Sequence, residues 1–160
     1  MVKEKAKIAI IILNWNQTDL TLACLKSVFQ SRIDGQIEIE AIVVDNGSTD
    51  DSKKRLKEIQ ENKNLFRQGR GEIRISRSKF PNFKVIFNKE NLGFAGGNNV
   101  GIRYALKNKA DFIFILNNDT EIKNDCILNL WQTFLEEEKI GIASPKIYYA
   151  PGFEFHKERY

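Results

Sequence analysis

The sequence predicts an α/β fold, a mainly parallel sheet with helices on both of its faces. Short apolar segments of strand length alternate along the chain with longer segments of helical periodicity. The first of them, KIAIIILN at residues 7–14, is almost continuously apolar, as in a strand that is covered on both faces. The 160 residues are enough for one core, so we expect a single domain over residues 1–160.

Each expected element follows from its local pattern. Strands are expected at the apolar segments 7–14, 37–45, 83–88 and 112–117, with a short fifth strand at residues 140–144. Helices are expected at residues 18–31, 48–62, 95–109 and 124–138. Ser48 is expected to cap the second helix, because Asp50 and Asp51 follow it and favour a helix start. The long connection at residues 62–82 is expected either to hold a small hairpin or to be mobile.

The composition excludes several classes of protein. No apolar run reaches the roughly 18 residues that cross a bilayer, and the charged N-terminus does not resemble a signal peptide. Cys24 and Cys126 form no CxxC pair, so we expect reduced, buried thiols in a cytoplasmic protein. His156 is the sole histidine, and we expect it to be an exposed residue of the C-terminal tail.

The net charge of +4 is concentrated in one stretch. Residues 63–89 contain eight lysines and arginines against the single acidic residue Glu72. Such a stretch is either a solvated basic loop or a surface for phosphates, anionic lipids or nucleic acid. Because neither zinc-ligand spacing nor an aromatic RNA-binding pattern accompanies it, we expect no nucleic-acid partner.

Polar residues follow each of the first four expected strands, at the edge where ligands of open α/β sheets bind. They form four clusters: Asn14 and Asn16 around Trp15; Asp45, Asn46, Gly47 and Ser48; Asn88 with Glu90 and Asn91; and Asn117, Asn118 and Asp119. One such cluster means little, because Asn and Asp end strands in most proteins. Four clusters at one edge predict a site for a polar ligand, and Trp15 either packs or lines this site.

The turn motifs narrow the choice of ligand. No GxGxxG follows the first strand and no Walker A motif is present, so a dinucleotide cofactor is not expected. The turn GFAGGNN at residues 93–99 allows close backbone approach at a helix start, which suits a phosphate. A tight packing turn explains the same glycines nearly as well.

Four motifs in fixed order then carry a family resemblance. They are ILNWNQTDLTLACLKSVFQS, IVVDNGSTDDS, NKENLGFAGGNNVGIRYA and FILNNDTEI. Together they resemble the family 2 glycosyltransferases, and NLGFAGGNNVGI is most similar to the rhamnosyltransferase-like branch of that family. The resemblance extends to about residue 149. It implies the GT-A fold, a Rossmann-like three-layer sandwich in which the N-terminal half binds a nucleotide-diphosphate sugar.

The resemblance also implies roles for individual residues. The first strand's end would border the nucleotide base, with Leu13, Asn14, Trp15 and Asn16. Asp45 would accept a hydrogen bond from a pyrimidine ring. The ribose, diphosphate or sugar would lie near Asn91, Gly93, Gly96, Gly97 and Asn98. Asn117, Asn118 and Asp119 match the family's Asp-x-Asp position, where Asp119 would hold Mg²⁺ or Mn²⁺ on the diphosphate and the two asparagines would contact the sugar or water.

The activity implied by the resemblance is an inverting sugar transfer from a dTDP- or UDP-sugar. The sugar would be rhamnose, and the acceptor a saccharide or lipid-linked saccharide in cell-surface polysaccharide biosynthesis. Such an enzyme would act in the cytoplasm, with peripheral contact at the inner face of the membrane. A homo-oligomer is a further expectation, because a shortened sheet exposes apolar surface.

The general base of the family has no counterpart that we recognise in this sequence. Glu154 and Glu158 are acidic, but their surroundings do not match the family's motif. Because complete family domains are longer, we expect this chain to be an N-terminal fragment that lacks the acceptor half. The alternative is a non-catalytic nucleotide-sugar-binding or assembly module. A sugar-phosphate nucleotidyltransferase is disfavoured, because NWNQTD lacks a glycine-rich loop with Arg or Lys.

Overall fold

The computed structural model describes residues 5–61, 66–68, 71–73 and 82–149. Ten helices and strands lie in this part of the chain. In order they are β1 (Ala6–Asn14), α1 (Thr18–Phe29), β2 (Ile37–Asp45), α2 (Ser52–Glu61), β3 (Phe66–Gln68), β4 (Gly71–Ile73), β5 (Asn82–Phe87), α3 (Gly93–Lys107), β6 (Phe112–Asn117) and α4 (Cys126–Glu136). The four long strands lie within one residue of their predicted bounds.

The main sheet has four parallel strands in the order β5-β2-β1-β6, which confirms the predicted parallel sheet. Its register aligns the ends of the strands. Asn14 is the partner of Asp45, Leu13 is the partner of Asn117, and Asp45 is also paired with Phe87. The polar residues that follow all four strands therefore meet at one edge of the sheet.

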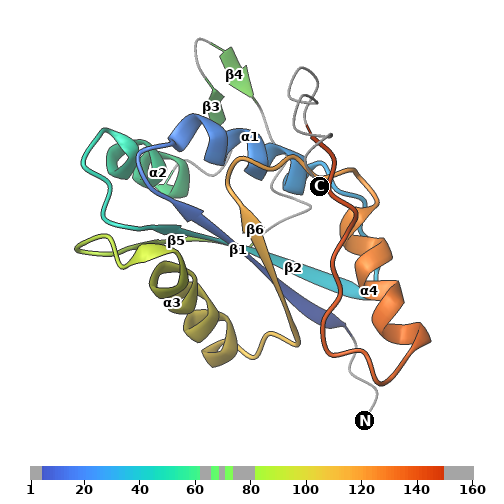
Figure 1. Ribbon diagram of the computed structural model, residues 1–160. Coiled ribbons are helices and arrows are strands. Elements are labelled where there is room, and N and C mark those ends of the chain that lie inside the picture. Colours follow the sequence, from blue (N-terminus) through green and yellow to red (C-terminus); the bar gives the residue numbers. More distant parts are fainter. Residues whose placement is uncertain (1–4, 62–65, 69–70, 74–81, 150–160) are drawn as a thin grey trace.

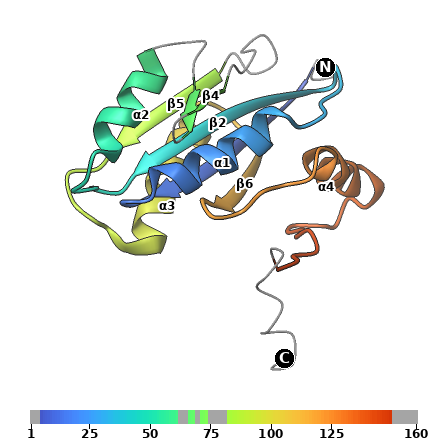
Figure 2. The same ribbon diagram turned by 90° about the horizontal axis from the view of Figure 1, so that it is seen from above.

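Helices cover both faces of the sheet and make three layers, as Figures 1 and 2 show. α1, α2 and α4 contribute to the larger apolar core, where Leu25, Leu56 and Trp131 pack with β1 and β2. α3 covers the opposite face, where Ala105 packs against Ile11 and Val44. β1 and β2 are buried on both faces, which explains their nearly continuous apolar sequences.

Small residues let α3 approach the sheet closely. Gly97 and Gly101 lie four residues apart on α3, and Ala105 follows at the same spacing. A Cβ at Gly101 would lie 2.7 Å from Ile11 Cγ2, and one at Gly97 would lie 2.4 Å from Leu13 Cδ1. The backbone of α3 thus rests directly on the side chains of the strands.

Two local predictions are wrong. Residues 140–144 form no strand, and Ile142 is 92% exposed. The chain instead runs back beside α4, where residues 144–148 and α4 line a cavity of about 500 Å³. Ser48 does not cap α2, which begins at Ser52, because the Ser48 hydroxyl is bonded to Asp45 instead. Asp50 accepts a hydrogen bond from the Ser52 N–H over 2.9 Å. The Ser52 hydroxyl, and to a lesser extent this N–H, hold the pKa of Asp50 below its usual value.

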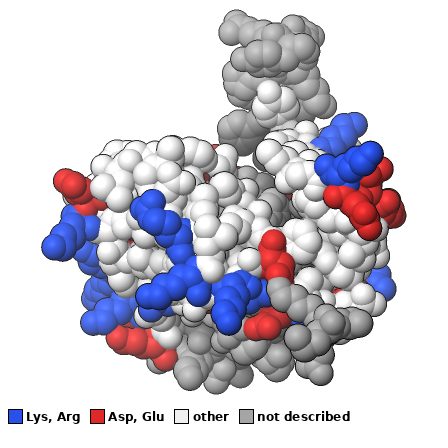
Figure 3. Space-filling model, turned by 90° about the horizontal axis from the view of Figure 1, so that it is seen from below, with Lys and Arg blue, Asp and Glu red and all other residues white. Residues whose placement is uncertain are grey.

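The predicted hairpin in the long connection is confirmed, since β3 and β4 pair as a two-stranded antiparallel sheet. Five of the eight basic residues in the stretch at residues 63–89 lie outside the described residues, as do His156, Glu154 and Glu158. Figure 3 shows basic side chains next to one another on part of one molecular face, with acidic side chains beside them. No described helix is both long enough and apolar enough to cross a membrane.

Candidate functional site

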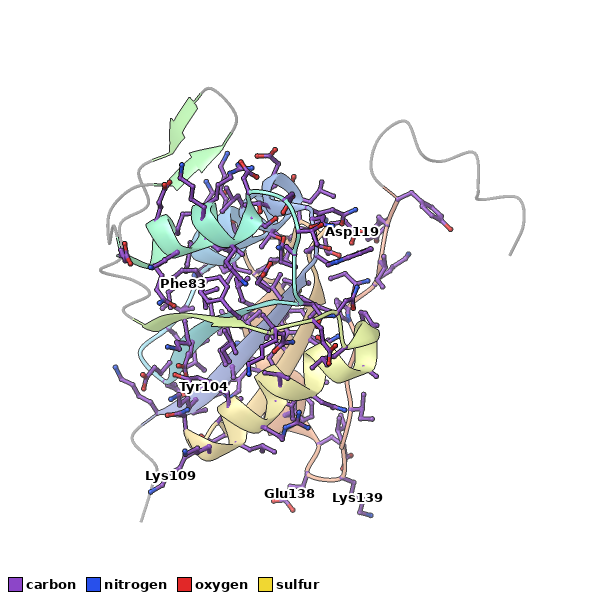
Figure 4. All side chains as sticks on the ribbon, turned by 90° about the vertical axis from the view of Figure 1, so that its left-hand side faces the viewer. Phe83, Tyr104, Lys109, Asp119, Glu138 and Lys139 are labelled. Carbon is purple, nitrogen blue, oxygen red and sulfur yellow. The ribbon has the colours of Figure 1, made fainter. Side chains whose placement is uncertain are left out.

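The polar edge of the sheet lies at one end of the molecule. Figure 4 shows Asp119 there, far from Lys109, Glu138 and Lys139 at the other end. Asp119 follows β6 by two residues, and the ends of β1 and β2 lie beside it in the sheet. The four polar clusters predicted from the sequence are therefore brought together.

The centre of this edge is a fully buried pair of polar side chains. Asn14 and Asp45 have no exposed surface, and Asn14 Nδ2 donates to Asp45 Oδ1 over 2.8 Å. The carboxylate also accepts hydrogen bonds from the Ser48 hydroxyl at 2.5 Å and from the Ser48 N–H at 3.3 Å. Asp45 is thus surrounded by protein donors, which satisfy a buried charge that would otherwise be costly.

A second set of contacts joins the end of β6 to α1. Asn118 Nδ2 donates to the Thr21 hydroxyl and to Gln17 Oε1, both over 3.3 Å. Thr21 is fully buried, and its hydroxyl donates to Asn14 Oδ1 over 2.8 Å. One threonine of α1 therefore links the residue after β6 to the last residue of β1, which in turn bonds the last residue of β2.

Asn46 holds the turn that leads into α3. Its Oδ1 accepts from Asn88 Nδ2 at 3.0 Å and from the Leu92 N–H at 3.1 Å. Its Nδ2 donates to Asn91 Oδ1 at 2.8 Å and to the Gly93 carbonyl at 3.1 Å. Asn46 is 2% exposed, so this amide uses its full hydrogen-bonding capacity inside the protein.

Two glycines adopt backbone conformations that suit this turn. Gly47 and Gly93 have φ angles of +73° and +72°, in the left-handed region. A Cβ at Gly47 would lie 2.4 Å from the Glu90 carbonyl carbon, whereas Gly93 has open space. Gly97 packs on Leu13 and Asn46, and a Cβ at Gly96 would lie 2.9 Å from Leu92 Cβ. The glycine-rich segment therefore works at least partly as a tight packing turn.

A cavity of about 270 Å³ opens at this edge. Its lining residues are Leu13, Trp15, Gln17, Phe94, Asn98, Leu116, Asn117, Asn118 and Asp119. The side chains of Trp15 and Phe94 are 51% and 63% exposed, and they come from the ends of two different elements. Trp15 thus lines this cavity and does not pack in the apolar core, and its contact with a ligand stays a prediction.

The structure places the thirteen predicted site residues differently relative to the cavity. Six of them line the cavity directly, and they are Leu13, Trp15, Asn98, Asn117, Asn118 and Asp119. Asn14, Asp45, Asn91 and Gly97 lie behind it and support it. Asn16 binds the loop after β2, where its Oδ1 accepts from the Thr49 N–H over 2.8 Å. Gly93 and Gly96 form the start of α3.

Five residues of the site were given no role of their own by the sequence. Gln17, Phe94 and Leu116 line the cavity, while Thr21 and Asn46 hold its walls. Asn46 belonged to a predicted cluster, but its four bonds depend on the turn before α3. Thr21 lies inside a segment of helical periodicity, where a single threonine does not indicate a functional site. A search for polar residues on the buried stripe of α1 would have found it.

Two carboxylates, Asp119 and Glu121, act on the thiol of Cys24 at this edge. Burial, together with the smaller effects of the Asp119 and Glu121 carboxylates, raises the pKa of the Cys24 thiol to about 12. Cys24 lies behind the end of β6, where its Sγ is 3.6 Å from the Asn117 carbonyl oxygen.

The donor set suits a hard cation that brings other oxygen ligands with it. Asp119 is exposed and lies beside the amides of Asn117 and Asn118 on the cavity. In the described part of the chain, no three His, Cys, Asp or Glu side chains gather to hold a metal by themselves. One carboxylate with amide oxygens fits Mg²⁺ or Mn²⁺ when phosphate oxygens complete the shell.

Known structures share this fold. S. aureus TarS 1-349 in complex with UDP-GlcNAc is 20% identical with a TM-score of 0.61, over 88% of this chain and 37% of that chain. The mannosyltransferase PcManGT from Pyrobaculum calidifontis, in complex with GDP-Man and Mn²⁺, is 17% identical with a TM-score of 0.61, over 81% of this chain and 32% of that chain. This chain thus spans about a third of the length of these structures.

Sequence comparison identifies the family. No curated protein matches the chain at a significant level. The family model described as glycosyl transferase family 2 matches residues 9–160, which is nearly the whole sequence. The four-stranded parallel sheet, the polar edge and this match agree with one another, and the chain belongs to glycosyl transferase family 2.

Proposed function

We propose that this chain binds the donor nucleotide-diphosphate sugar of an inverting glycosyltransferase. The observation that carries the proposal is the cavity at the carboxyl edge of the sheet, which has aromatic side chains on its wall and Asp119 on its rim. The family match supports this function, and the two structural neighbours are complexes with UDP-GlcNAc and with GDP-Man and Mn²⁺. The donor class that we propose is a dTDP- or UDP-sugar.

Different residues of the cavity would contact different parts of the ligand. Trp15 and Phe94 offer flat apolar surfaces to a base or a sugar ring. Asp119 would hold Mg²⁺ or Mn²⁺ together with diphosphate oxygens, and Asn117 and Asn118 lie next to it. The bound cation would neutralise charge on the departing diphosphate.

Asp45 does not line the cavity, but it hydrogen-bonds Asn14 behind the cavity wall. The contact of Asp45 with a pyrimidine stays a prediction, and it requires neighbouring groups to move, because the Asp45 side chain is fully buried. In the arrangement described above, Asp45 orients Asn14 instead. Asn98 is the deepest polar residue of the cavity: it is 4% exposed, and its Nδ2 donates to the Phe94 carbonyl.

For the rest of the reaction we propose a saccharide or lipid-linked saccharide acceptor at the cytoplasmic face of a membrane, as in cell-surface polysaccharide biosynthesis. Rhamnose as the donor sugar is supported by the motif at residues 93–99. No described residue is assigned as the general base. Transfer assays with dTDP-rhamnose and with UDP-sugars would identify the donor.

Calorimetric titration of UDP and dTDP, with and without Mn²⁺, tests the proposal. We expect at least one nucleotide to bind more tightly with Mn²⁺. Asp119→Asn should weaken Mn²⁺-dependent binding by about tenfold or more, without changing the urea midpoint of unfolding. Glu136→Gln is the matched control, because Glu136 is an exposed residue of α4 that does not line the cavity. Absence of nucleotide binding to the wild type in Mn²⁺ would overturn the proposal.

A non-catalytic assembly module is a second candidate, and one observation favours it. Leu135, Ile142 and Ile147 are 59%, 92% and 82% exposed on and after α4. Exposed apolar surface of this kind often marks a contact with another protein, and here we propose a second copy of the chain. Light scattering after size exclusion tests it, and a monomer over the whole accessible concentration range would contradict it.

A further inference from the structure

We propose that Thr21 is a positioning residue of the nucleotide site. The charge of Asp45 orients the Asn14 amide, and the Thr21 hydroxyl passes this orientation on to the Asn118 amide. Asn118 lies next to Asp119 in the sequence. The inference rests on the proposed function, because it assigns Thr21 a role in the same site. Thr21 does not line the cavity, so it acts through Asn118 rather than on the ligand.

The contacts form a continuous chain of hydrogen bonds. Asn118 Nδ2 donates to Thr21 Oγ1 at 3.3 Å, and Thr21 Oγ1 donates to Asn14 Oδ1 at 2.8 Å. Asn14 Nδ2 then donates to Asp45 Oδ1 at 2.8 Å. The side chains of Asn14, Thr21 and Asp45 have no exposed surface. The fourth, Asn118, is partly buried at the cavity. Water therefore competes little for the inner bonds.

The Asp45 charge sets the direction of every bond in this chain. An ionised carboxylate only accepts hydrogen bonds, so Asn14 must turn its NH₂ group toward Asp45 and its carbonyl oxygen toward Thr21. The single proton of the Thr21 hydroxyl then goes to Asn14, and the hydroxyl oxygen is left to accept from Asn118. Neutral groups alone would allow the opposite direction equally well.

The consequence for the cavity is a fixed amide orientation at Asn118. Both protons of its NH₂ group are directed to protein acceptors, Thr21 Oγ1 and Gln17 Oε1. The carbonyl oxygen is the polar atom of this amide that remains for a ligand, and it lies in the residue adjacent to Asp119. Asn118 therefore offers the cavity an acceptor, which suits a ligand hydroxyl or a cation better than a phosphate oxygen.

Two substitutions at Thr21 separate the hydroxyl from the rest of the side chain. Thr21→Val keeps the shape and removes the hydroxyl, whereas Thr21→Ser keeps the hydroxyl. We expect Thr21→Val to weaken UDP binding in Mn²⁺ by about tenfold or more, as for other residues that orient metal-site ligands. Thr21→Ser should restore most of the affinity. Equal affinities of the wild type and Thr21→Val would overturn the proposal.

Thr133→Val is the matched control, because it makes the same substitution in α4, where the Thr133 hydroxyl donates to the Asn129 carbonyl and the residue does not line the nucleotide cavity. We expect it to leave UDP binding in Mn²⁺ within about twofold of the wild type. An effect as large as that of Thr21→Val would contradict a special role for Thr21. If Thr21→Val does not fold, Thr21→Ala replaces it in both comparisons.

A measurement without any nucleotide distinguishes failure of this inference from failure of the proposed function. The side-chain NH₂ signals of Asn118 in a ¹H–¹⁵N NMR spectrum are assigned by their loss in Asn118→Asp. We expect these signals to shift in Thr21→Val and to return in Thr21→Ser. Unchanged signals in Thr21→Val would overturn the inference. Shifted signals with no UDP binding to the wild type would instead support the hydrogen-bond chain and overturn the proposed nucleotide.

Discussion

Asn14 and Asp45 are register partners at the ends of two neighbouring parallel strands, and their buried side chains are joined by a 2.8 Å hydrogen bond. The pair links the backbone of the sheet to the geometry of the cavity. Asn14 reaches α1 through Thr21, and Asp45 reaches the loop after β2 through Ser48. A change in the charge of Asp45 should therefore affect both fold stability and the site.

Asp45→Asn should reduce the free energy of unfolding by about 2–3 kcal/mol, because bonds to a charged acceptor are strong and the new NH₂ group would face protein donors. Urea unfolding at neutral pH measures this change. Asp51→Asn is the control: the Asp51 side chain is 68% exposed and lies 4.0 Å from Arg55. It should change stability by less than about 0.5 kcal/mol. Equal stability of Asp45→Asn and the wild type would show that the carboxylate is not needed.

The two glycines with left-handed backbone make a second test. Gly93→Ala should cost about 1–2 kcal/mol, the usual penalty of a side chain in this conformation. Gly47→Ala should cost about 1–3 kcal/mol more, because its Cβ would overlap the Glu90 backbone and push the turn away. The difference in urea midpoint between the two variants measures this contact. Equal losses would mean that the turn at residues 88–91 moves without cost.

The strands of the main sheet could be predicted from the sequence because two separate signals indicate each of them. β1, β2, β5 and β6 are apolar runs, and polar residues follow all of them directly. The apolar run at residues 140–144 lacks an equivalent position in the fold, since the chain runs beside α4 there instead of pairing with a strand. An apolar pattern shows that a segment can form a strand, but the segment does so only where a neighbouring strand is available for pairing.

The sequence predicted where the site lies and most of its residues. It did not predict which of them line the cavity and which support it from behind. The register of the sheet decides that Asp45 faces Asn14 and Ser48, and the sequence does not contain that register. Thr21 and Asn118 are 97 positions apart, and their contact depends on how α1 lies on the sheet. Trp15 could not be placed either, because its exposure depends on the position of neighbouring elements.

Cys24 predicts a specific loss of stability at high pH. Its pKa is raised to about 12 in the folded protein by burial and by the charges of Asp119 and Glu121, from a usual value of 9.0. Below pH 9 the thiol is protonated in both states and this stabilisation is fully present. Between pH 9 and pH 12 the unfolded thiol loses its proton while the folded thiol keeps it, so stability falls by up to about 1.4 kcal/mol per pH unit.

Urea unfolding at pH 8 and pH 10 measures this loss, with Cys24→Ala as the control. The control removes the thiol but keeps Cys126 and every lysine and tyrosine, so their titration cancels in the comparison. We expect the wild type to lose about 1.4 kcal/mol more than Cys24→Ala between these pH values. The comparison uses the change with pH in each protein, because a cavity at residue 24 lowers the stability of the control at both pH values. Parallel losses in the two proteins would show that the Cys24 thiol ionises in the folded state as readily as in the unfolded chain.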